Sequence, residues 1–121
     1  MAEFRAAVRR RDGAAVVDLH GQIDRAASGP LAAAYAEAAQ TPGAIVLNFE
    51  GVDYINSTGI ALIVGLLARA RAEHRTIGAC GLSDHYREIF EITRLSDFMG
   101  IYADEDSAAA PAAAANTGRQ S

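Results

Sequence analysis

Two short runs of apolar residues open the chain. Residues 4–10 and 14–20 flank the tripeptide Arg11-Asp12-Gly13, and the second run, AAVVDLH, is rich in β-branched residues. An Asp-Gly pair between two such runs is a strong turn signal. The pattern therefore predicts a β-hairpin, whose second strand ends in the segment 21–24 (GQID).

A helical pattern follows at residues 26–40. This segment is rich in alanine, and Leu31, Tyr35 and Ala38 recur at helical spacing. The breakers Thr41-Pro42-Gly43 end the predicted helix. Residues 44–49 (AIVLNF) form a short, mostly apolar run, which predicts a central strand buried on both faces and then a loop through Ile55.

The second half of the chain repeats the alternation. It predicts a helix from about residue 57 to 73, a strand at 76–80, a helix from 85 to about 94 and a last short strand at 101–102. The hairpin supplies an antiparallel strand pair, and the later crossovers supply parallel ones. We therefore expect an α/β domain with a mixed β-sheet.

The composition changes at residue 105. Residues 108–115 are alanine except for Pro111, and a proline inside a helix costs about 3 kcal/mol. At most a short helix is therefore expected before a frayed tail. The predicted organisation is one domain over residues 1–104, followed by an alanine-rich C-terminal helix or frayed tail over residues 105–121.

Composition narrows the possible functions. The chain has 121 residues, half of them apolar, which suffices for one hydrophobic core. Its net charge of −4 argues against direct nucleic-acid binding, because phosphate backbones are bound by clustered Arg and Lys. No apolar run is long enough for a membrane span, and the start lacks a signal-peptide centre, which predicts a cytoplasmic protein. The single cysteine, Cys80, excludes an internal disulfide and is expected in the core.

The start of the second long helix carries two adjacent hydroxyls, Ser57 and Thr58. If Asn56 is the N-cap, Ile55 and Ile60 take the positions of a hydrophobic staple. Asn56 would then satisfy the free amides and leave the Ser57 hydroxyl uncommitted. In the alternative interpretation, both hydroxyls belong to ordinary polar residues of a first helical turn.

A phosphate on Ser57 would bring about −1.5 to −2 charges to the positive end of this helix. The helix dipole tolerates such a charge, so the domain should stay folded. Burying the charge without partners in an interface would cost ~3 kcal/mol, roughly a 150-fold loss of affinity. The position therefore suits an on/off switch of protein binding.

The same helix carries more leucines than one buried face needs. Leu62 and Leu66 lie roughly 110 to 150° from the centre of the predicted core face. They are either buried by a neighbouring helix or form an exposed apolar patch beside Ser57. Gly65, between them, would permit close approach of another backbone. The predicted core face consists of Ile60, Ile63, Val64 and Leu67.

Two motifs resemble the STAS domain, specifically the bacterial anti-sigma-factor antagonists. The segment Gly21-Gln22-Ile23-Asp24 is similar to the family's G-E-[LI]-D, and IVLNFEGVDYINSTGIALIVG looks like its strand, loop, D-S-[ST]-G and helix. The resemblance covers about residues 4–104, more loosely at 82–98. It implies one STAS-like domain with helices packed mainly on one face of the sheet.

The resemblance also implies a function. In this family the unphosphorylated antagonist binds a GHKL-type anti-sigma kinase and frees the sigma factor. The kinase then phosphorylates the first hydroxyl of D-S-[ST]-G with ATP, and a PP2C-type phosphatase reverses this. The phosphoacceptor falls on Ser57, with Thr58 as the alternative. The expected partner-binding residues are Gln22, Asp24, Asn56, Ser57, Thr58, Gly59, Leu62 and Leu66.

Two residues depart from the family pattern. Asn56 stands where Asp is usual, and Gln22 where Glu is usual, so two carboxylates are missing from the expected kinase-binding surface. Asn keeps the capping role, but kinase recognition or the phosphorylation rate could change. A non-phosphorylated STAS scaffold, or a sensory or transport-complex interaction domain, is the alternative function.

The sequence offers little for an enzyme. Ser57 lies in N-S-T-G and not in a G-x-S-x-G elbow, and no histidine has the context of a catalytic base. Neither a Gly-rich phosphate loop nor a cysteine-rich metal site is present. We therefore expect a binding protein without cofactor or metal.

Overall fold

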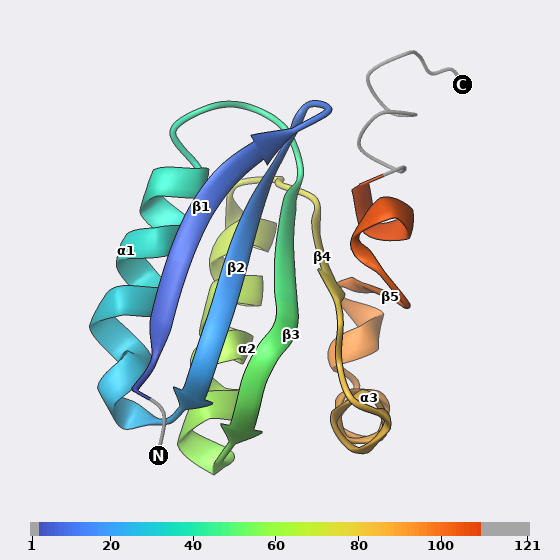
Figure 1. Ribbon diagram of the computed structural model, residues 1–121. Coiled ribbons are helices and arrows are strands. Elements are labelled where there is room, and N and C mark those ends of the chain that lie inside the picture. The colour runs from blue at the N-terminus through green and yellow to red at the C-terminus, as the bar shows by residue number, and fades with distance from the viewer. Residues whose placement is uncertain (1–2, 110–121) are drawn as a thin grey trace.

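A five-stranded sheet forms the centre of the computed structural model, which describes residues 3–109. Its strands, in spatial order, are β1 (Arg5–Arg11), β2 (Ala14–Ile23), β3 (Ile45–Ile55), β4 (Ile77–Cys80) and β5 (Gly100–Tyr102). Strands β1 and β2 pair antiparallel, and each later pair is parallel. The predicted hairpin and mixed sheet are therefore confirmed (Figure 1).

Helices cover one face of this sheet. They are α1 (Ser28–Ala38), α2 (Ser57–Ala72) and α3 (Asp84–Ile92), with short 3₁₀ turns η1 (Arg25–Ala27) before α1 and η2 (Leu95–Asp97) after α3. Figure 1 shows α1 and α2 behind the sheet. The predicted α/β architecture is confirmed. Within residues 3–109, no helix combines the length and apolar character that crossing a membrane requires.

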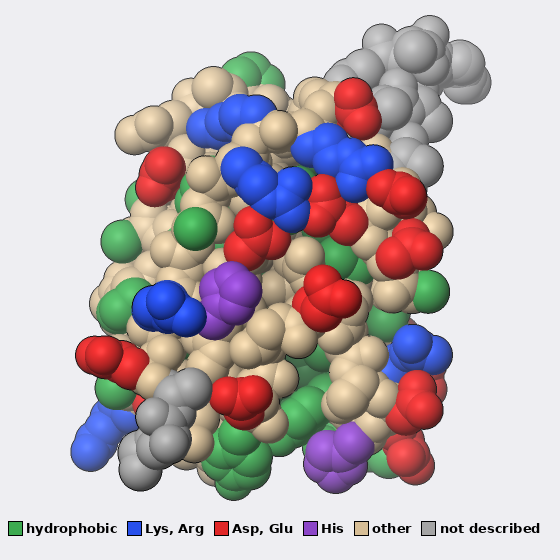
Figure 2. Space-filling model, viewed as in Figure 1, with side chains coloured by type: hydrophobic (Ala, Val, Ile, Leu, Met, Phe, Trp, Pro, Cys, Tyr) green, Lys and Arg blue, Asp and Glu red, His purple; other side chains and the backbone are tan. Residues whose placement is uncertain are grey.

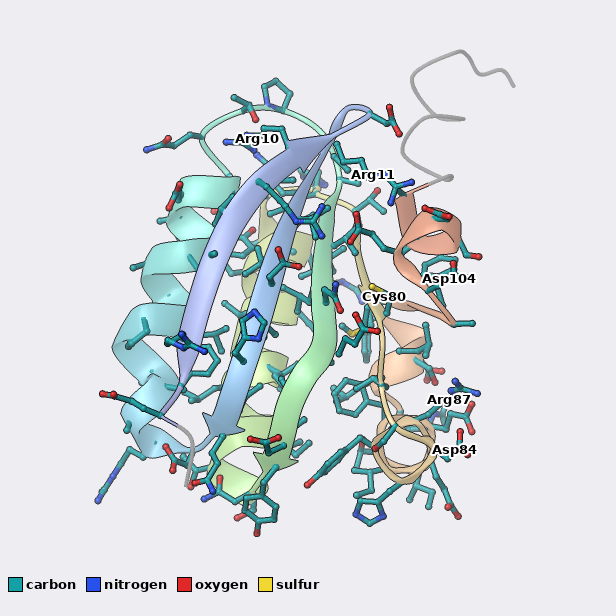
Figure 3. All side chains as sticks on the ribbon, in the orientation of Figure 1. Arg10, Arg11, Cys80, Asp84, Arg87 and Asp104 are labelled. Carbon is teal, nitrogen blue, oxygen red and sulfur yellow. The ribbon has the colours of Figure 1, made fainter. Side chains whose placement is uncertain are left out.

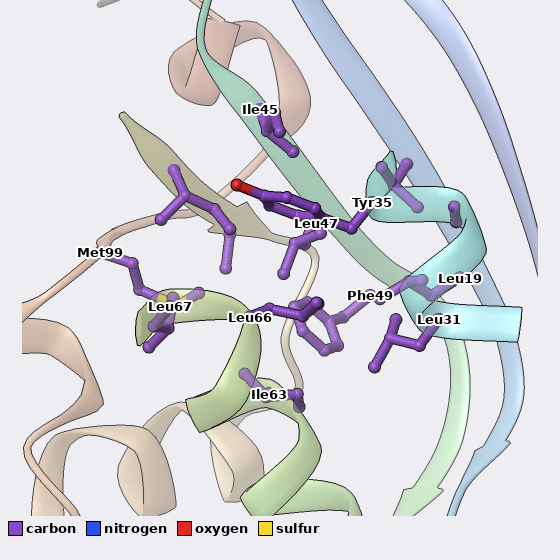
Figure 4. Close-up of a cluster of buried hydrophobic side chains, with 14 of the residues drawn as sticks. Leu19, Leu31, Tyr35, Ile45, Leu47, Phe49, Ile63, Leu66, Leu67 and Met99 are labelled. Atoms are coloured by element: carbon purple, nitrogen blue, oxygen red, sulfur yellow. The ribbon is translucent and has the colours of Figure 1, made fainter. Parts of the chain in front are cut away.

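The main core lies between the sheet and these helices. Leu47 and Phe49 of β3 point into it beside Ile63 of α2, and all three are at most 2 % exposed (Figure 4). Phe90 of α3 meets Phe49 edge to face, with ring centroids 5.7 Å apart. This contact places α3 on the same side as α1 and α2. Such aromatic pairs add about 0.5–1.5 kcal/mol beyond the burial of their area.

A smaller apolar cluster lies on the opposite face. Val16, Val46 and Cys80 are at most 1 % exposed there, together with Ala14 and Ala108. Strand β3 is thus buried on both faces at its start, as predicted for a central strand. Burial raises the pKa of the Cys80 thiol to about 11, which keeps it protonated at neutral pH. Cys80 is the core residue that was expected.

Residues 105–109 form a helical turn that packs against this second cluster. Glu105 forms ion pairs with Arg9 and Arg11, which extend from β1. Arg9 also pairs with Asp18 through Nε and Oδ2, 2.6 Å apart. Figure 2 shows basic and acidic side chains interleaved on this part of the surface, and Figure 3 shows Arg11 pointing toward the turn. The remainder of the predicted tail lies outside the described residues.

The predicted loop before Ile55 is wrong, because β3 continues to that residue. Gly51, Val52, Tyr54 and Ile55 pair with the end of β2, with register shifts in between. This half of the strand contains polar residues, which suggested a loop. Pairing with β2 satisfies its backbone groups and outweighs the low strand propensity of the side chains.

The predicted core face of α2 is rotated from the observed one. Val64 was expected inside and is 44 % exposed, whereas Leu66 is 6 % exposed and belongs to the core. The reason is Gly59, whose missing side chain lets the first turn press against the end of β2. Hydrophobic periodicity gives glycine no weight, so it placed the buried face too far toward Val64.

Candidate functional site

The expected site lies where the parallel strands reach their carboxyl ends. Strand β2 ends at Ile23 and β3 at Ile55, and η1 and α2 begin directly after them, at the lower edge in Figure 1. The backbone N–H of Asn56 donates to the carbonyl oxygen of Ile23 over 3.2 Å. The motif segments 21–24 and 56–59, which are far apart in sequence, are therefore neighbours. Ligand sites of open α/β sheets are typically found at this edge.

Asn56 is the N-cap of α2, as predicted. Its backbone is extended, and its Oδ1 accepts from the backbone N–H of Gly59 over 2.8 Å. Ser57 and Thr58 follow as the first helical residues, and both side chains are exposed. Within residues 3–109, the backbone N–H groups of Ser57 and Thr58 have no protein acceptor. The site thus offers an accessible hydroxyl beside two free amides at the positive end of a 16-residue helix.

Gly59 fixes how α2 leaves the sheet. A β-carbon built there would lie 2.1 Å from the carbonyl oxygen of Ile23 and 2.9 Å from Cγ2 of Ile55. No real side chain fits such a gap, so only glycine allows this approach of helix and strand. Gly59 is buried and shapes the surface from below.

A tyrosine from α3 holds the other side of the site. The backbone N–H of Ile55 donates to the hydroxyl oxygen of Tyr86 over 2.9 Å. Tyr86 is itself placed by the cap of α3, where its backbone N–H donates to the side-chain oxygen of Ser83. The segment that carries Ser57 is therefore tied both to β2 and to α3, which limits its freedom to move.

The structure separates the expected partner-binding residues into surface and support. Ser57 and Thr58 are exposed, while Gln22, Asp24, Asn56 and Leu62 are partly exposed. Asp24 caps η1, where its Oδ1 accepts from the backbone N–H of Ala26 over 3.0 Å. Leu66 and Gly59 are buried. The alternative in which Leu66 is covered by the fold is therefore correct, and the patch beside Ser57 lacks this leucine.

Sequence reasoning missed Tyr54, which is 51 % exposed. It pairs in register with Gln22 and lies two residues before the helix cap. Exposed tyrosines are enriched at protein interfaces, so Tyr54 extends the candidate surface along the sheet edge. Counting β3 through to Ile55 with strict alternation would have placed Tyr54 on the outer face.

The geometry offers no catalytic partner for Ser57. His20, His74 and His85 are all exposed, and within residues 3–109 none is hydrogen-bonded to the Ser57 hydroxyl. The same residues contain no group of three His, Cys, Asp or Glu side chains placed to hold a metal ion. What the site can do is present a hydroxyl for modification on a surface that is otherwise rigid and accessible.

Comparison with known proteins agrees with this geometry. Residues 6–101 match the family model described as “Mlab, STAS domain”. The chain belongs to the STAS domain family. BtrV of Bordetella bronchiseptica, which carries the name of an anti-sigma factor antagonist, is 31% identical over 107 residues, 88% of this STAS domain chain and 90% of BtrV.

A second relative is the anti-sigma-B factor antagonist of Staphylococcus aureus. It is 39% identical over 57 residues, which are 47% of this chain and 53% of that protein. The matched part of the chain thus spans about half the length of this relative. The anti-sigma factor antagonist from Mycobacterium paratuberculosis has the same fold, with a TM-score of 0.78 at 23% identity, covering 91% of this chain and 94% of that one.

The phosphorylated form of SpoIIAA, a Bacillus cell-fate determinant, also shares the fold. Its TM-score is 0.64 at 21% identity, and the match covers 87% of this chain and 96% of that chain. The resemblance to the anti-sigma-factor antagonists, suggested by the two motifs, is therefore confirmed at the level of family and fold. Its relatives are named for regulatory binding.

Proposed function

We propose that this STAS domain is an anti-sigma-factor antagonist switched by phosphorylation of Ser57. In the unphosphorylated form it binds a GHKL-type anti-sigma kinase, which then releases its sigma factor. Phosphorylation ends this binding, and a PP2C-type phosphatase restores it. The domain itself is not an enzyme, and it acts on transcription through this protein partner.

One observation carries the proposal. The Asn56 side chain takes the capping role, so the Ser57 hydroxyl is exposed and uncommitted at the start of α2. In the transfer, the Ser57 oxygen bonds to the γ-phosphorus of ATP as the bond to ADP breaks. The hydroxyl proton passes to a base supplied by the kinase.

The helix start also explains why the switch spares the fold. A phosphate on Ser57 would meet the free amides of the first turn and the positive end of the helix dipole. The fold tolerates the added charge, while a complementary interface over Ser57, Thr58 and Tyr54 does not. An uncompensated buried charge of this kind costs ~3 kcal/mol, roughly 150-fold in affinity.

Three variants test the proposal with the cognate kinase. Intact mass after incubation with kinase and ATP should rise by one phosphate in the wild type and in Thr58→Ala, and should not change in Ser57→Ala. Ser57→Asp should unfold at the same denaturant concentration as the wild type yet bind the kinase on the order of 100-fold more weakly. Normal kinase binding by Ser57→Asp would reject the switch and favour a non-phosphorylated scaffold.

A further inference from the structure

A groove separate from the Ser57 site runs between the second half of α2 and the segment after α3. It has a volume of about 280 Å³. Its floor is formed by Leu67 and Leu95, which are 5 % and 4 % exposed. Val64 and Phe98 stand on its two sides and are 44 % and 54 % exposed. Two large apolar side chains thus face solvent beside a hollow that is itself apolar, which is typical of a protein interaction site.

The charges of the groove are opposite in sign to the protein as a whole. The chain carries a net charge of −4, yet the charged residues that line the groove are Arg71 and Arg94. Within residues 3–109, Arg71 makes no ion pair, and its guanidinium lies 5.3 Å from the centroid of the Phe98 ring. Arg94 is paired with Asp97 over 2.7 Å. Arg71 is therefore a cation held on an apolar wall and available to a carboxylate.

Size decides between a small ligand and a protein segment. Small-molecule sites usually enclose about 300–1,000 Å³ and bury most of the ligand. This groove is smaller and open along α2, so it suits one or two apolar side chains of a longer segment. Ala61, Val64, Ala68 and Arg71 recur with helical spacing on the exposed side of α2, and the short side chains among them let a second helix approach closely.

We propose that the groove between α2 and η2 binds an acidic amphipathic helix of a partner protein. An apolar side chain of that helix fills the space over Leu67 and Leu95, against Val64 and Phe98. A carboxylate one turn away pairs with Arg71. This is the helix-in-groove mode of recognition, in which apolar anchors repeat at i, i+3 or i+4.

The site is distinct from the proposed phosphorylation switch. Fourteen residues of α2 separate Ser57 from Arg71, which is about 21 Å at 1.5 Å per residue. The inference therefore does not depend on the proposed function. Its test uses neither a kinase nor a phosphate, so the two can fail separately.

The probes are two synthetic helical peptides with the same leucine face, one carrying Glu and the other Lys at all polar positions. Binding is followed by amide and methyl NMR shifts of the full chain. The Glu peptide should shift the signals of Val64, Leu67, Leu95 and Phe98 and should bind at least tenfold more tightly than the Lys peptide. The difference should shrink at high salt, because the ion pair to Arg71 is screened.

Two charge reversals make the test specific. Arg71→Glu should weaken the Glu peptide at least tenfold and strengthen the Lys peptide. Arg5→Glu changes the net charge equally at an exposed position on β1, away from the groove, and should leave both affinities within twofold. Denaturation curves of all three proteins verify folding.

Several outcomes would overturn the proposal. Equal binding of the two peptides, or equal losses in Arg71→Glu and Arg5→Glu, would show that the groove does not select acidic helices. Concentration-dependent shifts at Val64 and Phe98 without any peptide would identify the occupant as a second copy of the chain. Shifts confined to residues around Ser57 would place the peptide elsewhere.

Discussion

The carbonyl oxygen of Ile23 lies directly against the α-carbon of Gly59, where a β-carbon would come within 2.1 Å of it. This approach joins the end of β2 to the first turn of α2. It brings the two sequence motifs into one surface and sets the rotation of the helix. The packing of a backbone on a backbone, with no side chain between, is therefore what places Ser57 beside Asp24 and Gln22.

Gly59→Ala tests this relationship. Alanine is the better helix former by about 1 kcal/mol, so propensity alone predicts a more stable protein. The clash with Ile23 should outweigh that gain and lower the free energy of unfolding by about 2 kcal/mol or more. Urea denaturation measures the change.

Gly65→Ala is the matched control for this prediction. Gly65 lies in the same helix, and a β-carbon there would meet nothing within 4 Å. This substitution should raise the free energy of unfolding by up to about 1 kcal/mol. If the two alanine variants had the same stability, the close contact of Gly59 with Ile23 would not be the reason for glycine at that position.

Asn56 allows capping to be separated from recognition. Asn56→Ala removes the acceptor for the Gly59 amide and should lower the free energy of unfolding by about 1 kcal/mol. Asn56→Asp keeps the acceptor and adds a negative charge at the positive helix end, so its stability should equal or slightly exceed that of the wild type.

The same two variants report on the kinase. Asn56→Asp restores the carboxylate of the family's D-S-[ST]-G pattern and should raise the initial rate at which a cognate kinase phosphorylates Ser57. The rate is followed by intact mass against time. An unchanged rate would mean that the kinase does not read this carboxylate and that Asn56 serves the fold alone.

Glu105 makes stability depend on pH. Hydrogen bonds from Arg9 and then Arg11 lower the pKa of the Glu105 carboxyl from 4.5 to about 2. A group with a lowered pKa in the folded state stabilises the fold above its unfolded pKa and loses this effect as the pH falls toward the folded value. Glu105→Gln should therefore cost about 1 kcal/mol at pH 7, since both arginines are partly exposed.

The cost of Glu105→Gln should shrink between pH 4.5 and about pH 2, the range over which the wild-type carboxyl takes up its proton. Chemical denaturation across this range measures it. Glu88→Gln is the control, since Glu88 is exposed on α3 and makes no ion pair within residues 3–109. A pH-independent difference between Glu105→Gln and the wild type would contradict the assigned ion pairs.

Local signals carried most of the prediction. The Asp-Gly turn specified the hairpin, and the spacing of Ile55, Asn56 and Ile60 identified the helix cap, because each depends on residues a few positions apart. The motif segments 21–24 and 56–59 then located the site and the family. These features need no knowledge of distant contacts.

The errors came from contacts between distant segments. The extension of β3 depends on pairing with β2, and the rotation of α2 depends on Gly59 meeting Ile23. The hydrogen bond from Ile55 to Tyr86 joins residues 31 positions apart, so no periodicity could reveal it. The groove beside Phe98 was missed for the same reason, since η2 follows α3 and returns to α2 only in three dimensions.

The interior of this protein does not stop where its homology does. The family match ends at residue 101, yet Ala108 and Ala109 are 4 % and 2 % exposed, sealed over Val16, Val46 and Cys80. A shortened chain trimmed to the homologous boundary would bare this greasy strip and leave Arg9 and Arg11 without Glu105. Such fragments should stick to one another through the open sheet, so expression or fusion boundaries belong beyond residue 109.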